Sequence, residues 1–93
     1  MNAGPERPRL ARKVRLRFDR RTERYLLLYP ERGLALNPTA GSIAELLDGE
    51  RTVSEIVELL SLKYTSRPRD VIEKDVLAFL ASLRERGLIE GSA

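Results

Sequence analysis

The side chains of this 93-residue chain that could do chemistry are carboxylates and cations, because the chain contains neither His nor Cys. Without an imidazole or a thiol, the usual general base, the usual nucleophile and the usual zinc ligands are missing. The chain also has no glycine-rich phosphate-binding loop. We therefore expect a non-catalytic protein, with no metal and no cofactor, that binds a partner through main-chain groups, apolar surface and charge.

The basic residues are concentrated in the first quarter of the chain. Residues 1–24 contain nine Arg or Lys against three acidic residues, whereas the remainder has eight basic and eleven acidic residues. Arg15 and Arg17 lie within the basic segment and are candidates for electrostatic contact with a partner. Because a charge run is more often a solvated strand face, both interpretations stay open at this point.

Three strands are predicted in the first part of the chain. Strict alternation from Val14 places Leu16 and Phe18 on one buried face. Residues 25–29 are apolar on both faces and end at Pro30. A turn from Pro30 leads to a third strand, residues 33–37, in which Gly33 is expected to serve the turn itself. The three strands form a small antiparallel meander, preceded by a mobile arm over residues 1–9, so that the single domain spans residues 10–91.

Two helices are predicted after the meander. Asn37 can cap the first helix, which begins at Pro38 and which we expect to end at Gly49. Thr52 and Glu55 form a capping box for the second helix, which reaches about residue 64.

A third helix completes the predicted bundle. Asp70 and Glu73 form a possible capping box at its start, and Gly87 ends it. The residues after Gly87 are expected to fold back onto the core. Its core-facing stripe is Ile72, Val76, Phe79, Leu80 and Leu83. The predicted class is α+β and winged-helix-like: a three-stranded antiparallel sheet followed by a three-helix bundle.

The third predicted strand is too short for a central strand, so we expect one of its edges to lack a partner within the chain. Beside the core stripe of the third helix, small or polar side chains recur at Asp75, Ala78 and Ser82. A free strand edge next to such a flank has the components for peptide capture by strand addition, although these helix residues could equally be exposed helix formers. The candidate peptide-binding residues are Gly33, Leu34, Ala35, Leu36, Asn37, Val71, Lys74, Asp75, Ala78 and Phe79.

A winged-helix nucleic-acid module is the alternative, because three helices and a small sheet also make up that fold. The chain has no Gln and its third helix exposes acidic residues such as Glu73 and Glu85, which makes that helix poorly suited to read bases or contact phosphates.

The stretch from Tyr25 to Leu60 resembles the PqqD family of pyrroloquinoline quinone (PQQ) biosynthesis. The resemblance starts near Pro8 and lies in the motifs LYPE-G (residues 28–33), LN (36–37) and ELLDG (45–49), and later in DV (75–76), FL (79–80) and RGL (86–88). It covers about nine-tenths of the chain.

The resemblance implies a non-catalytic peptide chaperone. Such proteins bind the ribosomal precursor peptide PqqA and present it to the radical-SAM enzyme PqqE. In the family the peptide adds as a strand against the third strand, beside the third helix. The Arg-rich segment could contact either the enzyme or the peptide.

Other properties follow from the bulk sequence. No apolar run approaches the ~20 residues of a membrane span, and the N-terminus lacks the pattern of a secretory signal, so we expect a cytoplasmic protein with neither membrane nor nucleic acid as partner. The free strand edge could also permit a homodimer, through edge pairing or strand exchange.

Overall fold

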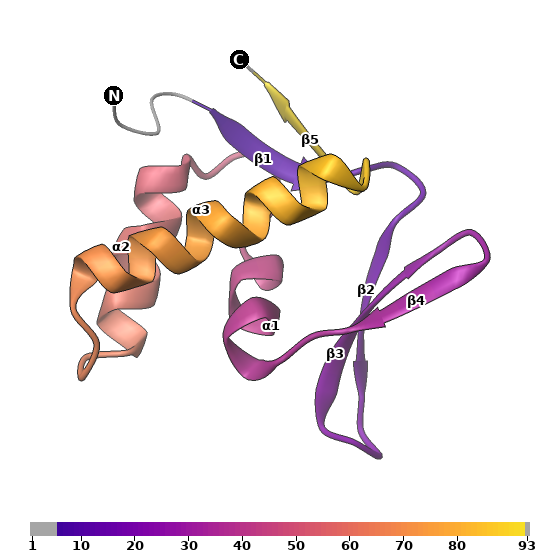
Figure 1. Cartoon of the computed structure of the whole chain (residues 1–93), viewed down its shortest axis with the longest axis horizontal. Helices are drawn as coiled ribbons and strands as arrows, with labels where there is room; N and C mark the ends of the chain where they lie inside the picture. The colour runs from indigo at the N-terminus through magenta and orange to yellow at the C-terminus, as the bar shows by residue number, and fades with distance from the viewer. Residues whose placement is uncertain (1–5, 93) are drawn as a thin grey trace.

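The structure is a computed structural model that describes residues 6–92. The helices lie together on one side of this part of the chain and a three-stranded sheet lies on the other (Figure 1). The elements in chain order are β1 (Arg7–Leu10), β2 (Arg15–Asp19), β3 (Arg24–Tyr29), β4 (Arg32–Ala35), α1 (Pro38–Glu45), α2 (Val53–Lys63), α3 (Arg69–Glu85) and β5 (Ile89–Ser92). The predicted α+β class, an antiparallel three-stranded sheet followed by three helices, is confirmed.

The main sheet has the strand order β2–β3–β4, and both strand pairs are antiparallel. Leu27 lies at its centre, fully buried, and pairs with Leu16 of β2 and Leu34 of β4. These three side chains share the face that packs on the helical core. Phe18, predicted on the same buried face, is 47% exposed, because the β2–β3 hairpin extends past the helices (Figure 1).

The connection between β3 and β4 is a two-residue turn, Pro30 and Glu31, shorter than predicted. Glu31 has the positive φ of this turn, 70°. The expectation that Gly33 serves the turn is therefore wrong. Gly33 lies within β4 and pairs with Leu28 of β3.

Local capping signals hold for most helix ends. Asn37 Oδ1 accepts the Ala40 N–H at 2.7 Å, and the Thr52–Glu55 capping box is present at the start of α2. After α3, Gly87 has φ of 71° and the Leu88 N–H donates to the Leu83 carbonyl at 2.9 Å, a Schellman ending. The chain then returns to the core at Leu88 and Ile89, as predicted.

Two helix ends differ from prediction. Helix α1 ends at Glu45 rather than Gly49, because the N–H groups of Leu46 and Leu47 donate to carbonyls only three residues back. Helix α3 begins at Arg69, and the proposed Asp70–Glu73 capping box is wrong. Pro68 occupies the cap position without a side-chain hydrogen bond, and its carbonyl accepts the first N–H groups of the helix.

A second sheet joins the two ends of the described chain, with β1 antiparallel to β5 (Figure 1). Pro8 is buried, Arg9 pairs with Glu90 at 3.0 Å, and Glu6 forms an ion pair with Arg84. Residues 7–9, which we assigned to a mobile arm, therefore belong to the folded structure, and the predicted boundary at residue 10 falls inside β1. Of the remaining arm residues, Glu6 forms the ion pair with Arg84, and residues 1–5 lie outside the described residues.

Candidate peptide-binding groove

Strand β4 is the edge of the main sheet, and among residues 6–92 it pairs only with β3. The Leu36 N–H donates to the Tyr25 carbonyl at 2.9 Å, so the main chain at position 36 faces β3. Hydrogen bonding alternates along an antiparallel strand, so position 34 also faces β3, whereas the N–H and C=O groups of Gly33 and Ala35 face away from it. These four groups form the free edge of the sheet.

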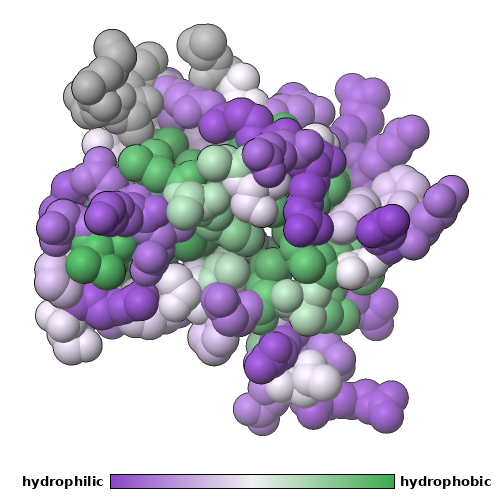
Figure 2. Space-filling view, viewed as in Figure 1, coloured by the Kyte–Doolittle hydropathy of each residue, from purple (hydrophilic) through white to green (hydrophobic). Residues whose placement is uncertain are grey.

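A pocket of about 320 Å³ lies where β4 leads into α1 and α3 passes beside it. Ile43 and Phe79 contribute apolar surface, and Ala78 is small enough to leave the pocket open. The complete lining is Asn37, Thr39, Ala40, Ile43, Arg67, Asp75, Ala78 and Phe79. Figure 2 shows apolar surface between α3 and the main sheet, with hydrophilic surface on either side.

The charges at the pocket are paired. Asp75 of α3 lies 3.4 Å from the guanidinium of Arg67, which belongs to the loop before α3. Both side chains are more than one-third exposed, so the pair is screened by solvent and its energy is small. The pair offers a bound segment both a donor and an acceptor.

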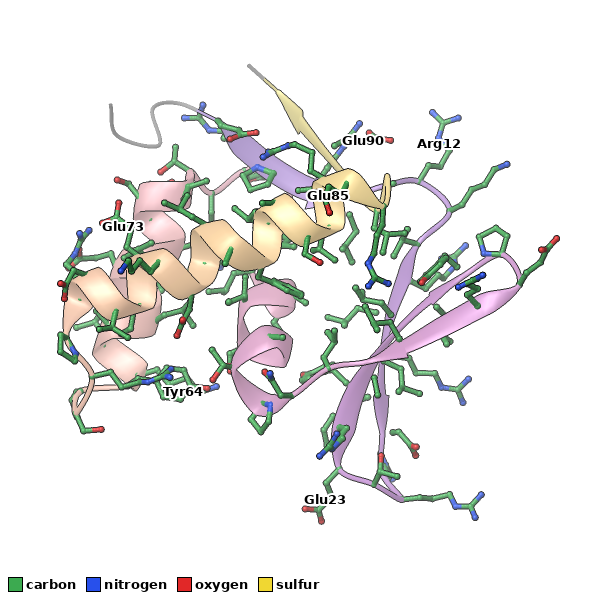
Figure 3. The ribbon with its side chains drawn as sticks, viewed as in Figure 1. Arg12, Glu23, Tyr64, Glu73, Glu85 and Glu90 are labelled. Atoms are coloured by element: carbon green, nitrogen blue, oxygen red, sulfur yellow. The ribbon has the colours of Figure 1, made fainter. Side chains whose placement is uncertain are left out.

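Arg67 also belongs to a cationic cluster around Tyr64, the residue that follows α2 and is labelled in Figure 3. The Arg67 guanidinium and the Lys63 ammonium stand 5.8 and 5.5 Å from the centre of the Tyr64 ring. The Tyr64 hydroxyl and Lys63 both contact Ser42 Oγ, at 2.7 and 3.0 Å, which ties the end of α2 to α1. Arg67 of this cluster lines the pocket and is paired with Asp75, whereas Lys63 lines a neighbouring depression that shares Asn37 with the pocket and forms no ion pair among residues 6–92.

The structure brings together four of the predicted peptide-binding residues: Asn37, Asp75, Ala78 and Phe79 line one pocket. Gly33, Ala35 and the half-buried Leu34 lie on the adjoining edge strand. Leu36 is 3% exposed with its N–H bonded to Tyr25, so it supports the edge without offering a contact of its own.

The other predicted residues lie farther from this pocket. Val71 and Lys74 are exposed on α3 but do not line it. Arg15 and Arg17 are exposed on β2, at the opposite edge of the main sheet from β4, and are not part of the groove.

Sequence reasoning missed Thr39, Ala40, Ile43 and Arg67. The first three belong to α1, which follows the edge strand directly, and this adjacency was a usable signal. Arg67 lies in a loop with no periodicity, and nothing in the pattern indicated its pairing with Asp75.

Most of the chain matches the sequence profile of one known protein family. The sequence profile described as "Coenzyme PQQ synthesis protein D (PqqD)" matches residues 24–89, well over half of the chain. The chain belongs to the PqqD family. The predicted resemblance is thus confirmed.

Named relatives agree with this PqqD assignment. The chain is 43% identical over 83 residues to the PqqA binding protein of Rhodopseudomonas palustris (strain HaA2), covering 89% of this chain and 80% of that one. It is 41% identical over 88 residues to the bifunctional coenzyme PQQ synthesis protein C/D of Methylorubrum extorquens. That match covers 95% of this chain but only 23% of the longer protein.

Solved structures confirm the PqqD fold. The NMR structure of the PqqD truncation of Methylobacterium extorquens PqqCD, described as a stand-alone recognition element for ribosomally synthesized and modified peptides, superposes with a TM-score of 0.77. It shares 41% identity and covers 89% of this chain and 87% of that one. TbiB1 in complex with the TbiA(beta) leader peptide also has a TM-score of 0.77, at 25% identity, over 91% of this chain and 98% of TbiB1.

Proposed function

We propose that this chain is a non-catalytic chaperone of PQQ biosynthesis that binds the precursor peptide PqqA and presents it to the radical-SAM enzyme PqqE. Relatives at 37–43% identity are named PqqA binding proteins, and a structural relative was solved with a leader peptide. The observation that supports this function most directly in the chain itself is the edge of β4, with the main-chain groups of Gly33 and Ala35 unpaired among the described residues, beside the α3 pocket.

In the proposed complex PqqA adds as a strand to β4 and lies between β4 and α3. Gly33 and Ala35 provide two N–H donors and two C=O acceptors, so the ladder within β4 has up to four hydrogen bonds. At a net ~1 kcal/mol each these bonds are offset by the cost of ordering the peptide, ~1–2 kcal/mol per residue. Micromolar affinity, about −8 kcal/mol, therefore depends on side chains.

The pocket beside α3 supplies the side-chain contribution. An apolar peptide residue can enter between Ile43, Ala78 and Phe79, and a neighbouring polar group can bond to Arg67 or Asp75. Lys63 forms no ion pair among residues 6–92 and favours an acidic peptide residue in the neighbouring depression that it lines with Asn37. Val71 and Lys74 lie farther along α3, where a longer peptide segment would contact them.

The proposed strand addition is compatible with presentation, because it binds a segment through its main chain and leaves the flanking peptide residues available to an enzyme. No catalytic group is needed for this role. Among residues 6–92 no acidic cluster that could hold a metal ion is present, and no helix is long and apolar enough to cross a bilayer.

Calorimetric titration with synthetic PqqA tests the binding, and we expect saturable one-to-one binding in the micromolar range. A PqqE assay with and without the chain tests the presentation. We expect cross-linked PqqA, detected by mass spectrometry, to form only when the chain is present. Undiminished cross-linking by PqqE alone would contradict the proposed presentation.

The nucleic-acid alternative rests on the basic N-terminal segment. It predicts binding of duplex DNA that weakens steeply between 50 and 200 mM salt, on the order of a thousandfold for six phosphate contacts. We expect a gel-shift titration at these two salt concentrations to show no duplex binding of this kind.

A further inference from the structure

The face of the main sheet that points away from the helices has its own chemistry. Register places Arg15 opposite Leu28 and Arg17 opposite Leu26. Leu26 and Leu28 alternate along β3 with Tyr25, Leu27 and Tyr29, which pack on the helical core, so they point to the other side. The outward face therefore has two leucines at its centre and two guanidinium groups on their flank; we call it the Arg–Leu face (Arg15, Arg17, Leu26, Leu28).

The Arg–Leu face is hollowed and its two guanidinium groups are not in ion pairs. A depression of about 550 Å³ adjoins Leu26 and Leu28, and the rest of its lining is Arg17, Phe18, Asp19, Arg20 and Arg21. Within residues 6–92, neither Arg15 nor Arg17 forms an ion pair. An apolar centre with unpaired cations beside it is complementary to a protein surface that has carboxylates around apolar side chains.

The apolar centre reaches the strand to which PqqA is proposed to add. Gly33 pairs with Leu28, and a β-carbon at Gly33 would lie 3.3 Å from Leu28 Cδ2, so the Leu28 side chain leans across the glycine toward the free edge. Ala35, which pairs with Leu26, is also exposed and has only a methyl group as its side chain. No large β4 side chain separates the leucines from the edge.

Strand addition would therefore extend the Arg–Leu face. Side chains directly opposite one another in paired strands point to the same side of a sheet. Peptide residues opposite Leu34 point toward the helices and α3, whereas those opposite Gly33 and Ala35 point outward, beside Leu28 and Leu26. The loaded protein then presents one continuous surface made of its own residues and of alternate peptide side chains.

We propose that the Arg–Leu face, completed by the outward side chains of bound PqqA, is the docking surface for PqqE. This inference rests on the proposed function and adds the location of the enzyme contact. It also implies that PqqE binds the PqqA-loaded chain more tightly than the empty chain, because the peptide contributes part of the surface.

Other occupants fit the face less well. A second copy docked face to face would present the same leucines and the same Arg15 and Arg17 cations, so its face is not complementary in charge. A nucleic acid would place phosphates over Leu26 and Leu28, which cannot neutralise them. An acidic protein surface with an apolar centre can bury the two leucines and form ion pairs with the two guanidinium groups.

The test compares two charge-reversal variants with the same change in net charge. Arg15→Glu/Arg17→Glu alters the Arg–Leu face, whereas Arg12→Glu/Lys13→Glu alters exposed residues of the β1–β2 connection. PqqE affinity is measured by fluorescence anisotropy with and without saturating PqqA, and PqqA affinity by calorimetry. We expect the first variant to lose about tenfold or more in PqqE affinity and the second variant about threefold or less, with PqqA affinity unchanged in both.

The outcomes separate this inference from the proposed function. If the wild-type chain fails to bind PqqA, the proposed function is wrong. Two other outcomes, each with normal PqqA binding, would show that the location of the enzyme contact is wrong. In one, Arg15→Glu/Arg17→Glu binds PqqE with wild-type affinity; in the other, both variants lose the same factor in PqqE affinity. If circular dichroism shows that Arg15→Glu/Arg17→Glu does not fold, Arg15→Gln/Arg17→Gln replaces it, because it removes the same two positive charges. Wild-type PqqE affinity of that variant would likewise show that the location is wrong.

Discussion

Tyr25 of β3 lies so close to Gly41 of α1 that a β-carbon on the glycine would stand 2.9 Å from Cδ2 of the ring. The Tyr25 hydroxyl donates to the Glu45 carboxylate, which fixes the ring at its other end. This hydrogen bond, followed by burial and the charge of Glu45, raises the pKa of Tyr25 above its ordinary value of 10.0. The contact joins β3 to α1, the helix that directly follows the β4 edge.

Gly41→Ala tests this contact. In most helix interiors the change stabilises by up to ~1 kcal/mol. Here we expect the opposite sign, a loss of about 1–3 kcal/mol in the free energy of unfolding, because the methyl group displaces a ring held at both ends. Chemical denaturation measures the loss. In the Tyr25→Leu background, where the ring is absent, Gly41→Ala should be neutral or stabilising; an equal loss there would show that the contact is not its cause.

Ala35→Pro tests the β4 edge. The substitution removes an outward N–H, and the β3–β4 ladder is preserved because the bonds to β3 come from positions 34 and 36. We expect PqqA affinity, measured by calorimetry, to fall about tenfold or more. Ala35→Ser retains the N–H and should bind within about twofold of wild type. Full-strength binding by folded Ala35→Pro would contradict strand addition at this edge.

Ala78→Arg tests the pocket. The longer side chain fills the space between Asn37 and Phe79, so we expect PqqA affinity to fall about tenfold or more with little change in stability, since Ala78 is exposed. Leu77→Arg is the matched control, because Leu77 directly precedes Ala78 in α3 and does not line the pocket. If the two variants bind PqqA with equal affinity, the peptide does not occupy this pocket.

Asp48 gives the stability of the fold a pH dependence. Its carboxylate accepts the N–H groups of Glu50 and Arg51 at 2.9 and 3.1 Å, and the Arg51 guanidinium lies at 2.7 Å. The hydrogen bond from the Glu50 N–H is the largest cause that lowers the pKa of Asp48 below its ordinary value of 3.8, and the N–H and charge of Arg51 lower it further. Because the native pKa is below the unfolded one, the charged form stabilises the fold above pH ~4, and this is lost as the pH falls through the native pKa.

The corresponding measurement is the unfolding free energy of Asp48→Asn and wild type between pH 2.5 and 7. Asn keeps an acceptor oxygen and removes the charge. Solvent screening of this 41% exposed side chain limits the expected difference to about 1 kcal/mol at pH 7, and it should shrink as the pH falls. A difference that stays constant down to pH 2.5 would rule out the charge as its origin.

Features set by neighbouring residues could be predicted from the sequence. The Thr52–Glu55 capping box, the Asn37 cap and the Gly87 helix ending each depend on groups a few residues apart. The pairing of Arg7 with Ser92 is different, because it joins the two ends of the chain through strands of four residues, one of which includes Pro8. Nothing local indicates such a pairing.

The site was predictable to a similar degree. Helical spacing placed Asp75 and Ala78 on a flank of the third helix beside the core stripe that contains Phe79, and the structure brings these three residues together with Asn37. The contribution of Arg67 depends on how the loop before α3 folds back. The small separation of Tyr25 from Gly41 depends on the packing of sheet on helix, which periodicity does not define.

Residue-resolved amide hydrogen exchange with and without PqqA measures strand addition most directly. In the free protein we expect Leu36, whose N–H is bonded to Tyr25, to be protected and Gly33 and Ala35 to exchange rapidly. Saturation with PqqA should slow Gly33 and Ala35 by about tenfold or more and leave Leu36 unchanged; a dilution series of the free protein separates this from self-pairing of β4. If Gly33 and Ala35 still exchange rapidly with the peptide fully bound, PqqA does not pair with this strand.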